Sequence, residues 1–163
     1  MASSLETFFV YPTPLGRITL ASDGKALTHM AFGVQQFPGT YTATALTNRA
    51  STEIQEYLAG KRTVFDTPLN PYGTQYQQKV WRALCSIPYG ETRSYKEVAQ
   101  MTGKPNAMRA VGMANNKNPL PVFIPCHRVI GAKGDLVGYA YGLKIKQFLL
   151  DLEKKATKNG HLR

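Results

Sequence analysis

The chain has 163 residues, of which 43% are hydrophobic, and it carries a formal net charge of +10 with a pI near 9.7. This composition is typical of a folded protein, and the length allows one domain or two small ones. No apolar run approaches the roughly 18 residues that span a bilayer, and the first residues lack the basic and apolar regions of a secretory signal. Two cysteines, Cys85 and Cys126, are too few for a disulfide scaffold or a Cys-based zinc site. We therefore expect a reduced, cytoplasmic protein.

The first part of the chain has the pattern of a short antiparallel sheet followed by a helix. Residues 7–11, 17–21 and 26–32 are rich in β-branched, aromatic or alternating apolar residues, and Asp23-Gly24 predicts a hairpin between the last two segments. Apolar residues then recur at helical spacing up to position 58, before a glycine at the place of a C-terminal cap. We expect a small α+β structural domain here.

A linker and a change of charge coincide near residue 73. Residues 63–73 contain two prolines and a glycine, which makes them the best linker candidate. Residues 1–73 hold five basic and five acidic side chains, whereas residues 74–163 hold fifteen basic and five acidic ones. This asymmetry indicates that the region after the linker meets a polyanion, although a surface charged only for solubility is an alternative.

The region after the linker is predicted to be mostly helical. Thr74 is a candidate N-cap of a first helix, and Ser94 begins a capping box that opens a second, short helix. Gly103 ends this helix, and Pro105 suits the first turn of a third. The last two helices form a helix-turn-helix candidate over about 94–115, a spacing that purely structural hairpins also show.

The third helix has few polar side chains for reading bases. Its stretch 107–114 is mostly small or apolar and carries one basic residue, Arg109. A helix that reads the major groove usually presents several polar side chains, so this texture favours close approach in the minor groove with one inserted side chain. Helix packing by the small residues, with Arg109 paired to a carboxylate, is the equal alternative.

Cys126 and His127 stand side by side after an apolar run, 122–124, that is predicted to be a buried strand. The pKa of a thiol falls when an imidazole or a cation lies close, and His127 and Arg128 both supply such a group. Adjacent residues on a strand point to opposite faces, so a contact between Cys126 and His127 requires a turn or a bridging water. Glu153, on an apolar final helix, is the candidate to orient the histidine. For Cys85, on the apolar face of the first helix, we expect a role in the core.

These residues carry a family resemblance. The motif Pro-Cys-His-Arg-Val at 125–129, preceded by Asn118-Pro119 and followed by Gly138-Tyr139, resembles the methylated-DNA–protein-cysteine methyltransferases, which repair O6-alkylguanine. The resemblance spans about residues 74–153, whereas residues 1–73 agree only in length and in the order of strands and helix. It implies an α+β protein with a DNA-binding and catalytic domain over 74–163, which acts on double-stranded DNA containing alkylated guanine.

The resemblance also implies roles for individual residues. Cys126 would attack the alkyl carbon on guanine O6 and keep it as a permanent thioether. His127 would accept the thiol proton through a water, and Glu153 would orient His127. Asn118 would hold the shape of the active-site loop. Tyr95 would press on the target phosphate and protonate the leaving guanine at N3.

Further residues would bind the DNA and the flipped base. Arg109 would fill the hole that the flipped nucleotide leaves. The other DNA-binding residues implied are Tyr95, Lys96, Lys104, Ala107, Ala110, Gly112 and Arg128. The substrate pocket would consist of Val129, Tyr139, Ala140 and Tyr141. The carbonyls of Cys126 and Val129 would receive the guanine amine, and a backbone N–H near Ala140 would meet O6.

Two departures from the family pattern have consequences. The family commonly has Gly-Gly where this chain has Tyr141-Gly142, so we expect a narrower pocket that accepts O6-benzyl groups less well than methyl. Some members bind a structural zinc in the N-terminal domain, but residues 1–73 contain no cysteine and only His29. We expect no metal or nucleotide cofactor, a monomer with cooperative binding as an open question, and a mobile basic tail over 154–163.

Three rival functions remain open at this level. A non-catalytic lesion binder of the alkyltransferase-like kind replaces the nucleophile, and the presence of Cys126 argues against it. A helix-turn-helix transcription regulator would have a more polar recognition helix and usually a dimerisation region. A cysteine hydrolase would regenerate its thiol, whereas the alkyl transfer consumes one protein for each lesion. O4-methylthymine is a second candidate lesion beside O6-methylguanine.

Overall fold

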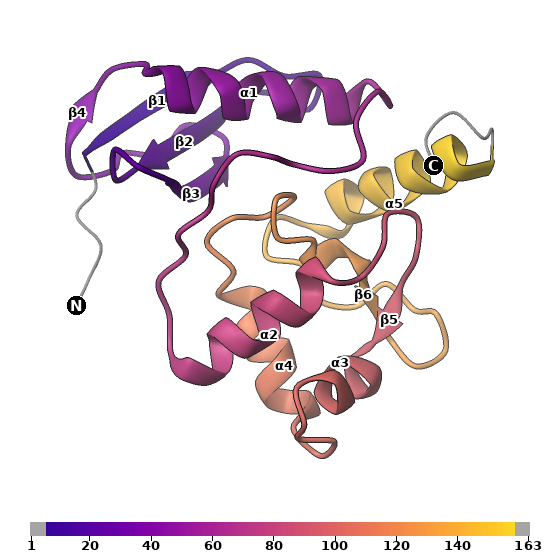
Figure 1. Cartoon of the computed structure of the whole chain (residues 1–163). Helices are drawn as coiled ribbons and strands as arrows, with labels where there is room; N and C mark the ends of the chain where they lie inside the picture. Colours follow the sequence, from indigo (N-terminus) through magenta and orange to yellow (C-terminus); the bar gives the residue numbers. More distant parts are fainter. Residues whose placement is uncertain (1–5, 159–163) are drawn as a thin grey trace. The chain divides into compact units, whose positions relative to one another are not determined.

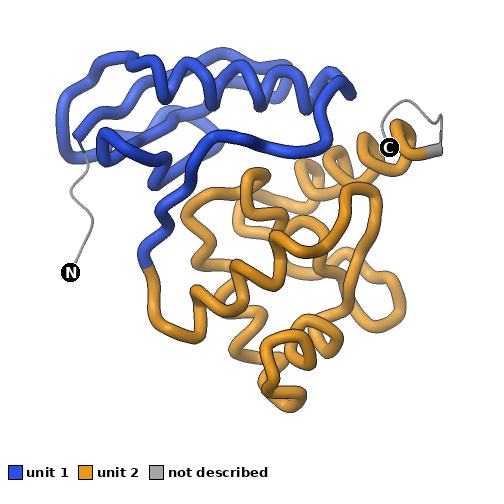
Figure 2. The backbone as a smooth tube through the Cα atoms, viewed as in Figure 1, with its two compact units in different colours: residues 1–72, 162 blue, residues 73–161, 163 orange. Residues whose placement is uncertain are grey.

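The computed structural model describes residues 6–158, and the chain divides into two compact units (Figures 1 and 2). The first unit ends at Tyr72 and the second begins at Gly73. No helix within residues 6–158 combines the length and the apolar character that a membrane span requires.

The first unit is a four-stranded sheet with one helix. Its elements are β1 (Thr7–Tyr11), β2 (Ile18–Ser22), β3 (Leu27–Phe32), β4 (Thr40–Tyr41) and α1 (Ala45–Leu58). The strand order is β3-β2-β1-β4, antiparallel except for the short parallel β4, which the sequence pattern did not predict. Asp23 closes the predicted hairpin because its carboxylate accepts the N–H groups of Lys25 and Ala26. The apolar face of α1, including Ile54 and Tyr57, is buried.

The second unit is mostly helical, as predicted. Its elements are α2 (Gln75–Cys85), β5 (Arg93–Ser94), α3 (Tyr95–Met101), α4 (Met108–Asn116), the 3-10 turn η1 (Cys126–Arg128), β6 (Val129–Ile130) and α5 (Leu143–Lys158). Thr74 and Ser94 each form a complete capping box at the start of α2 and α3. The indole N–H of Trp81 donates to the carbonyl of Ala114 at 3.0 Å and ties α2 to α4. The predicted α+β class with a helix-turn-helix is confirmed.

Several local predictions are wrong for physical reasons. Helix α4 begins at Met108, because Pro105 occupies a β-turn closed by the Ala107 N–H on the Lys104 carbonyl at 3.0 Å. Cys85 is exposed, since it is the last residue of α2 and lies outside the buried stripe of that helix.

The basic tail predicted from residue 154 onward is helical as far as Lys158, where α5 ends. The rest of that predicted tail lies outside the described residues.

A short parallel pair, β5 with β6, brings the helix-turn-helix beside the Cys-His segment. Arg93 pairs with Val129 and Ser94 pairs with Ile130. Because η1 runs directly into β6 and β5 runs directly into α3, the first residue of α3 lies next to the cysteine segment.

Candidate active site

The predicted strand at 122–124 is instead a tight buried turn that presents Cys126. Pro121 and Ile124 form an isolated bridge, and Val122 has a positive φ of 73°, which is rare for a β-branched residue. Asn118 clamps the turn: its amide N–H donates to the Ile124 carbonyl at 2.8 Å, and its amide oxygen accepts the Leu120 N–H at 2.9 Å. The chain satisfies its backbone groups through this side chain rather than through a sheet.

Cys126 is buried, and this burial governs its chemistry. Burial raises the pKa of the thiol to about 11, although a hydrogen bond from Asn118 and the charge of Lys146 act in the opposite direction. The expectation of a thiol pKa lowered by its two sequence neighbours is therefore wrong for the protein without substrate. His127 and Arg128 are both engaged by Glu153 instead.

A buried cluster of three ionisable side chains lies behind Cys126. His127 Nε2 and Glu153 Oε2 are 2.6 Å apart. Arg128 binds the same carboxylate with two nitrogens, Nε to Oε1 at 2.9 Å and Nη2 to Oε2 at 3.0 Å. The Gly90 N–H adds a second hydrogen bond to Oε1 at 3.0 Å, and Arg128 Nη1 donates to the Ile87 carbonyl at 2.7 Å.

Electrostatics keep Glu153 ionised and His127 neutral. Burial alone would raise the pKa of Glu153, but hydrogen bonds and charges from His127 and Arg128 outweigh it and hold that pKa at about 2. Burial lowers the pKa of His127 more than Glu153 raises it. Since Arg128 carries a permanent charge, the carboxylate remains an anion when the imidazole is neutral. A neutral imidazole held by an anion is suited to accept a proton.

Arg128 was predicted to bind DNA, and the structure contradicts this. The residue is 6% exposed and its guanidinium is occupied by Glu153 and the Ile87 carbonyl. It also lies over the Tyr89 ring at 5.7 Å. Its role is to hold the carboxylate that holds His127.

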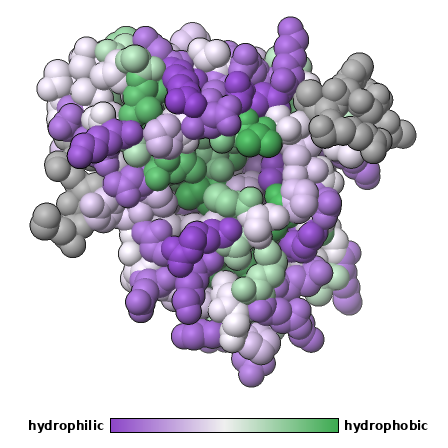
Figure 3. Space-filling model, viewed as in Figure 1, coloured by the Kyte–Doolittle hydropathy of each residue, from purple (hydrophilic) through white to green (hydrophobic). Residues whose placement is uncertain are grey.

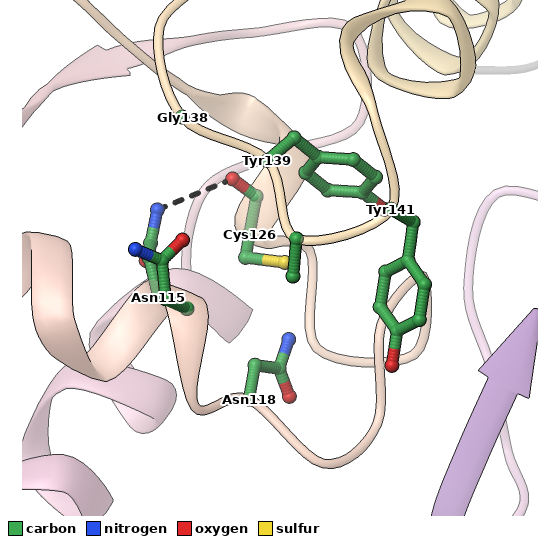
Figure 4. A pocket seen from close by; sticks show the side chains of 8 residues that line it. Asn115, Asn118, Cys126, Gly138, Tyr139 and Tyr141 are labelled. Carbon is green, nitrogen blue, oxygen red and sulfur yellow. Dashed lines mark hydrogen bonds between the residues drawn. The ribbon is translucent and has the colours of Figure 1, made fainter.

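A small closed pocket surrounds the Cys126 side chain (Figure 4). Its cavity is about 10 Å³, room for about one water. Asn115 and Asn118 lie on one side of Cys126, and Tyr139 and Tyr141 lie on the other, with their rings 6.0 Å apart edge to face. Asn116, Gly138 and Ala140 also line the pocket. The predicted pocket residues Tyr139, Ala140 and Tyr141 thus line the same space as the thiol. A cavity of this size does not admit a purine base in this conformation.

Tyr95 lies between the pocket segment and helix α4. Its hydroxyl donates to the Val137 carbonyl at 3.0 Å. A Cβ built on Gly138 would lie 3.5 Å from the Tyr95 hydroxyl oxygen. A Cβ on Gly112 would lie 3.9 Å from the Tyr95 ring. Burial, and then the charge of Cys126, raise the pKa of the phenol, so it is protonated at neutral pH.

The predicted DNA-binding side chains of α3 and α4 line an exposed groove. Tyr95, Lys96, Met108 and Arg109 border a groove of about 610 Å³. Arg109 is exposed and makes no ion pair within the described part of the chain, which decides against its pairing with a carboxylate. The visible face of the second unit is largely hydrophilic, with a smaller apolar area (Figure 3).

The remaining predicted DNA-binding positions are spread along and before α4. Ala107, Ala110 and Gly112 are partly exposed, and Lys104 is exposed with its ammonium 5.3 Å from the centre of the Tyr76 ring. Val129, predicted for the pocket, is fully buried, and its carbonyl accepts from Lys146 at 2.6 Å.

The sequence reasoning missed two residues of the site. Lys146 is fully buried, donates to the carbonyls of Val129 and Val137, and has a pKa lowered by burial. Its position three residues before Leu149 and seven before Glu153, on one helix face, could have revealed it. Asn115 is buried and donates to the Cys126 carbonyl at 3.4 Å, and no sequence pattern marks it.

Fold and site together define a class: a helix-turn-helix protein that presents a buried cysteine, backed by a histidine–carboxylate pair, in a pocket beside the helix-turn-helix. Comparison with known families agrees with this class. The family model for the DNA-binding domain of 6-O-methylguanine DNA methyltransferase matches residues 75–155. The model for the ribonuclease-like domain of the same enzyme matches residues 8–71, where sequence reading found only a similar order of elements.

Individual relatives are similar over nearly the whole chain. The methylated-DNA–protein-cysteine methyltransferase of Methanosarcina barkeri is 49% identical over 89% of this chain and 95% of its own length. That of Mycobacterium tuberculosis is 45% identical over 87% and 88%. The crystal structure of Mycobacterium tuberculosis OGT in complex with DNA superposes with a TM-score of 0.86 at 44% identity, over 92% of this chain and 94% of that one. The chain belongs to the methylated-DNA–protein-cysteine methyltransferase family.

Replacing Glu153 tests the buried cluster. Because the pKa of Glu153 falls from 4.5 to about 2 on folding, its contribution to stability is complete above pH 4.5 and is lost as the pH falls toward 2. This contribution is about 3 kcal/mol, from about 1.4 kcal/mol for each pH unit. We expect Glu153→Gln to be less stable at pH 7 and to lose less stability between pH 4.5 and 2, measured by urea unfolding. The exposed Asp151→Asn on the same helix should keep the wild-type acid profile. An unchanged slope in Glu153→Gln would contradict this account.

Proposed function

We propose that this protein repairs DNA by moving the alkyl group from O6 of a flipped guanine to its own Cys126, once per molecule. The Cys126 sulfur forms a bond to the alkyl carbon, the bond between that carbon and O6 breaks, and its electron pair stays on the base. The thiol proton goes to His127 and the departing guanine takes up a proton. The product is a thioether that the protein has no means to reverse.

The observation that carries this proposal is the position of Cys126. It lines a pocket bounded by the segment 138–141, directly before a histidine held by Glu153. The target atom is buried in duplex DNA, so the base must leave the stack to reach a thiol that itself lies inside the protein. Family membership and the DNA complex of the Mycobacterium tuberculosis relative support DNA as the partner.

The site fits a thiol that is activated only when substrate is bound. A thiol with a pKa of about 11 is protonated at neutral pH, which protects it from other electrophiles. Neutral His127 accepts the proton, and the charge of the buried Lys146 and a hydrogen bond from Asn118 stabilise the thiolate side of the equilibrium. Tyr95 keeps its phenolic proton and can deliver it to N3 of the base once its bond to the Val137 carbonyl is released.

Outside the pocket, the groove and its cations support contact with the DNA backbone. Arg109 stands at the start of α4 beside the groove, where it can enter the space left by the flipped base. The +10 charge supports salt-dependent binding to phosphates without sequence preference. We further propose that the protein acts on DNA as a monomer in the cytoplasm.

Transfer of a label tests the reaction itself. The protein is mixed with duplex DNA that carries isotopically labelled O6-methylguanine, and peptides are analysed by mass spectrometry. We expect label on Cys126, saturating at one methyl per protein and absent in Cys126→Ala. Cys85→Ala is the matched control because Cys85 is the other cysteine and is exposed. Repeated turnover, or label on Cys85, would overturn the proposal.

Replacement of Arg109 separates base flipping from chemistry. An inserted side chain stabilises the extruded base in a duplex but has no part in reaction with a free base. Arg109→Ala should therefore slow repair of duplex DNA by at least tenfold more than it slows methylation of Cys126 by free O6-methylguanine. Single-turnover rates on both substrates measure this, with Arg93→Ala as a cationic control. Equal losses on the two substrates would remove the finger role.

The two tyrosines of the pocket wall set the size of the alkyl group that fits. The Tyr141 ring stands edge to face against Tyr139 beside the thiol, where the family has a glycine. Tyr141→Gly should raise the rate with O6-benzylguanine by at least tenfold and change the rate with O6-methylguanine far less. Competition between the two free bases measures the ratio. A wild-type protein that reacts with the benzyl compound as fast as the Gly variant would refute this.

A further inference from the structure

One polar atom in the pocket has no partner. Asn115 is 7% exposed, and its amide oxygen makes no hydrogen bond within the described residues. Its amide N–H, in contrast, donates to the Cys126 carbonyl at 3.4 Å. This contact fixes the orientation of the amide, because a flipped side chain would set two carbonyl-type oxygens against each other. Asn115 lines the pocket (Figure 4), and its amide oxygen is therefore an acceptor without a donor among the described residues.

A buried acceptor without a donor is costly, and such atoms in folded proteins call for an explanation. The pocket around Cys126 is closed to about 10 Å³, so at most about one water reaches the Asn115 oxygen. The neighbouring Cys126 carbonyl is a second acceptor in the same patch and retains a lone pair beyond its bond to Asn115. Two adjacent acceptors match a ligand that carries an N–H₂ group.

Among the two candidate lesions, only one has such a group. Guanine carries an exocyclic amine, which remains after O6 is alkylated, whereas alkylation removes the proton from ring nitrogen N1. The amine lies on the same edge of the base as O6. A base placed with its O6 alkyl group at the Cys126 sulfur therefore directs the amine toward a neighbouring part of the pocket wall. O4-methylthymine has no N–H donor on the corresponding edge.

We propose that Asn115 is a specificity-determining residue whose amide oxygen accepts a hydrogen bond from the exocyclic amine of the flipped base. This inference rests on the proposed function. The family resemblance already implies the Cys126 carbonyl as an acceptor of this amine, and Asn115 adds a side-chain acceptor beside it, which favours O6-alkylguanine over O4-methylthymine. A base without the amine leaves the buried oxygen of Asn115 unsatisfied, which is how a polar site rejects an analogue that lacks one donor.

A pair of substrates that differ in a single group tests this. O6-methylhypoxanthine is O6-methylguanine without the 2-amino group, and each is placed in the same duplex sequence. Single-turnover methylation of Cys126 is measured for wild type, Asn115→Leu and Asn115→Asp. The quantity compared is the ratio of the two rates in each protein. The cost of flipping each base belongs to the DNA, so it cancels when ratios are compared between variants.

We expect wild type to favour O6-methylguanine, and Asn115→Leu to reduce this ratio about tenfold, since one hydrogen bond to a buried acceptor is lost. Asn115→Asp keeps an acceptor at the same place and should keep the preference, even if its charge slows both reactions. Asn48→Leu, the same change at an exposed position of α1, is the control and should give the wild-type ratio. The rate of Cys126 methylation by O4-methylthymine, relative to the rate with O6-methylguanine, should be higher in Asn115→Leu than in wild type.

The outcomes are distinguishable. An unchanged ratio in Asn115→Leu, whether both rates are kept or both fall by the same factor, would overturn the inference. Equal rates of wild type on the two bases would overturn it as well. If Asn115→Leu does not fold, Asn115→Ala, which also removes the acceptor, takes its place in the comparison. Failure of the proposed function is a separate result: no methyl would reach Cys126 from any substrate.

Discussion

The Glu153 carboxylate is the contact on which the second unit depends. It holds His127 through one oxygen and Arg128 through both, and it accepts the Gly90 N–H from the segment after α2. Helix α5, the turn η1 and the end of α2 are thereby joined at one buried anion. Such a buried ionic cluster adds little net stability over an apolar one, and removing one partner is costly. Its value here is that it fixes the imidazole beside the cysteine.

The same low-dielectric environment explains the state of the nucleophile. Desolvation keeps Cys126 protonated and His127 neutral. The thiol therefore has a proton to give, and the imidazole is able to accept it. A free thiolate here would be poised for any electrophile. In the proposed single-turnover reaction, a thiol that stays protonated until the base arrives is protected from other electrophiles. The segment 138–141, with its two tyrosine rings, lines the pocket and limits access to the thiol.

Local signals in the sequence predicted the frame well. The capping boxes at Thr74 and Ser94 and the hairpin at Asp23-Gly24 depend on residues three or fewer positions apart, so the helices and strands they bound were predictable. Contacts between residues far apart in the sequence were not predictable in this way. The family resemblance implied Arg128 as a DNA-binding residue, and it is buried only because Glu153 reaches it from a helix 25 residues later. The 122–124 run was apolar because it is buried, and burial does not distinguish a strand from a turn.

Charge and specificity occupy different parts of this site. The cations Lys96 and Arg109 lie beside an exposed groove, where long-range attraction to phosphate acts before any base is read. Asn115 and Tyr141 line the small pocket around Cys126, so in the proposed function they contact only a nucleotide that has already left the DNA helix. In the proposed function, binding to the DNA backbone and selection of the lesion thus involve different residues and successive steps. A change in the groove cations should alter how fast every lesion is found, whereas a change in the pocket alters which lesion is accepted.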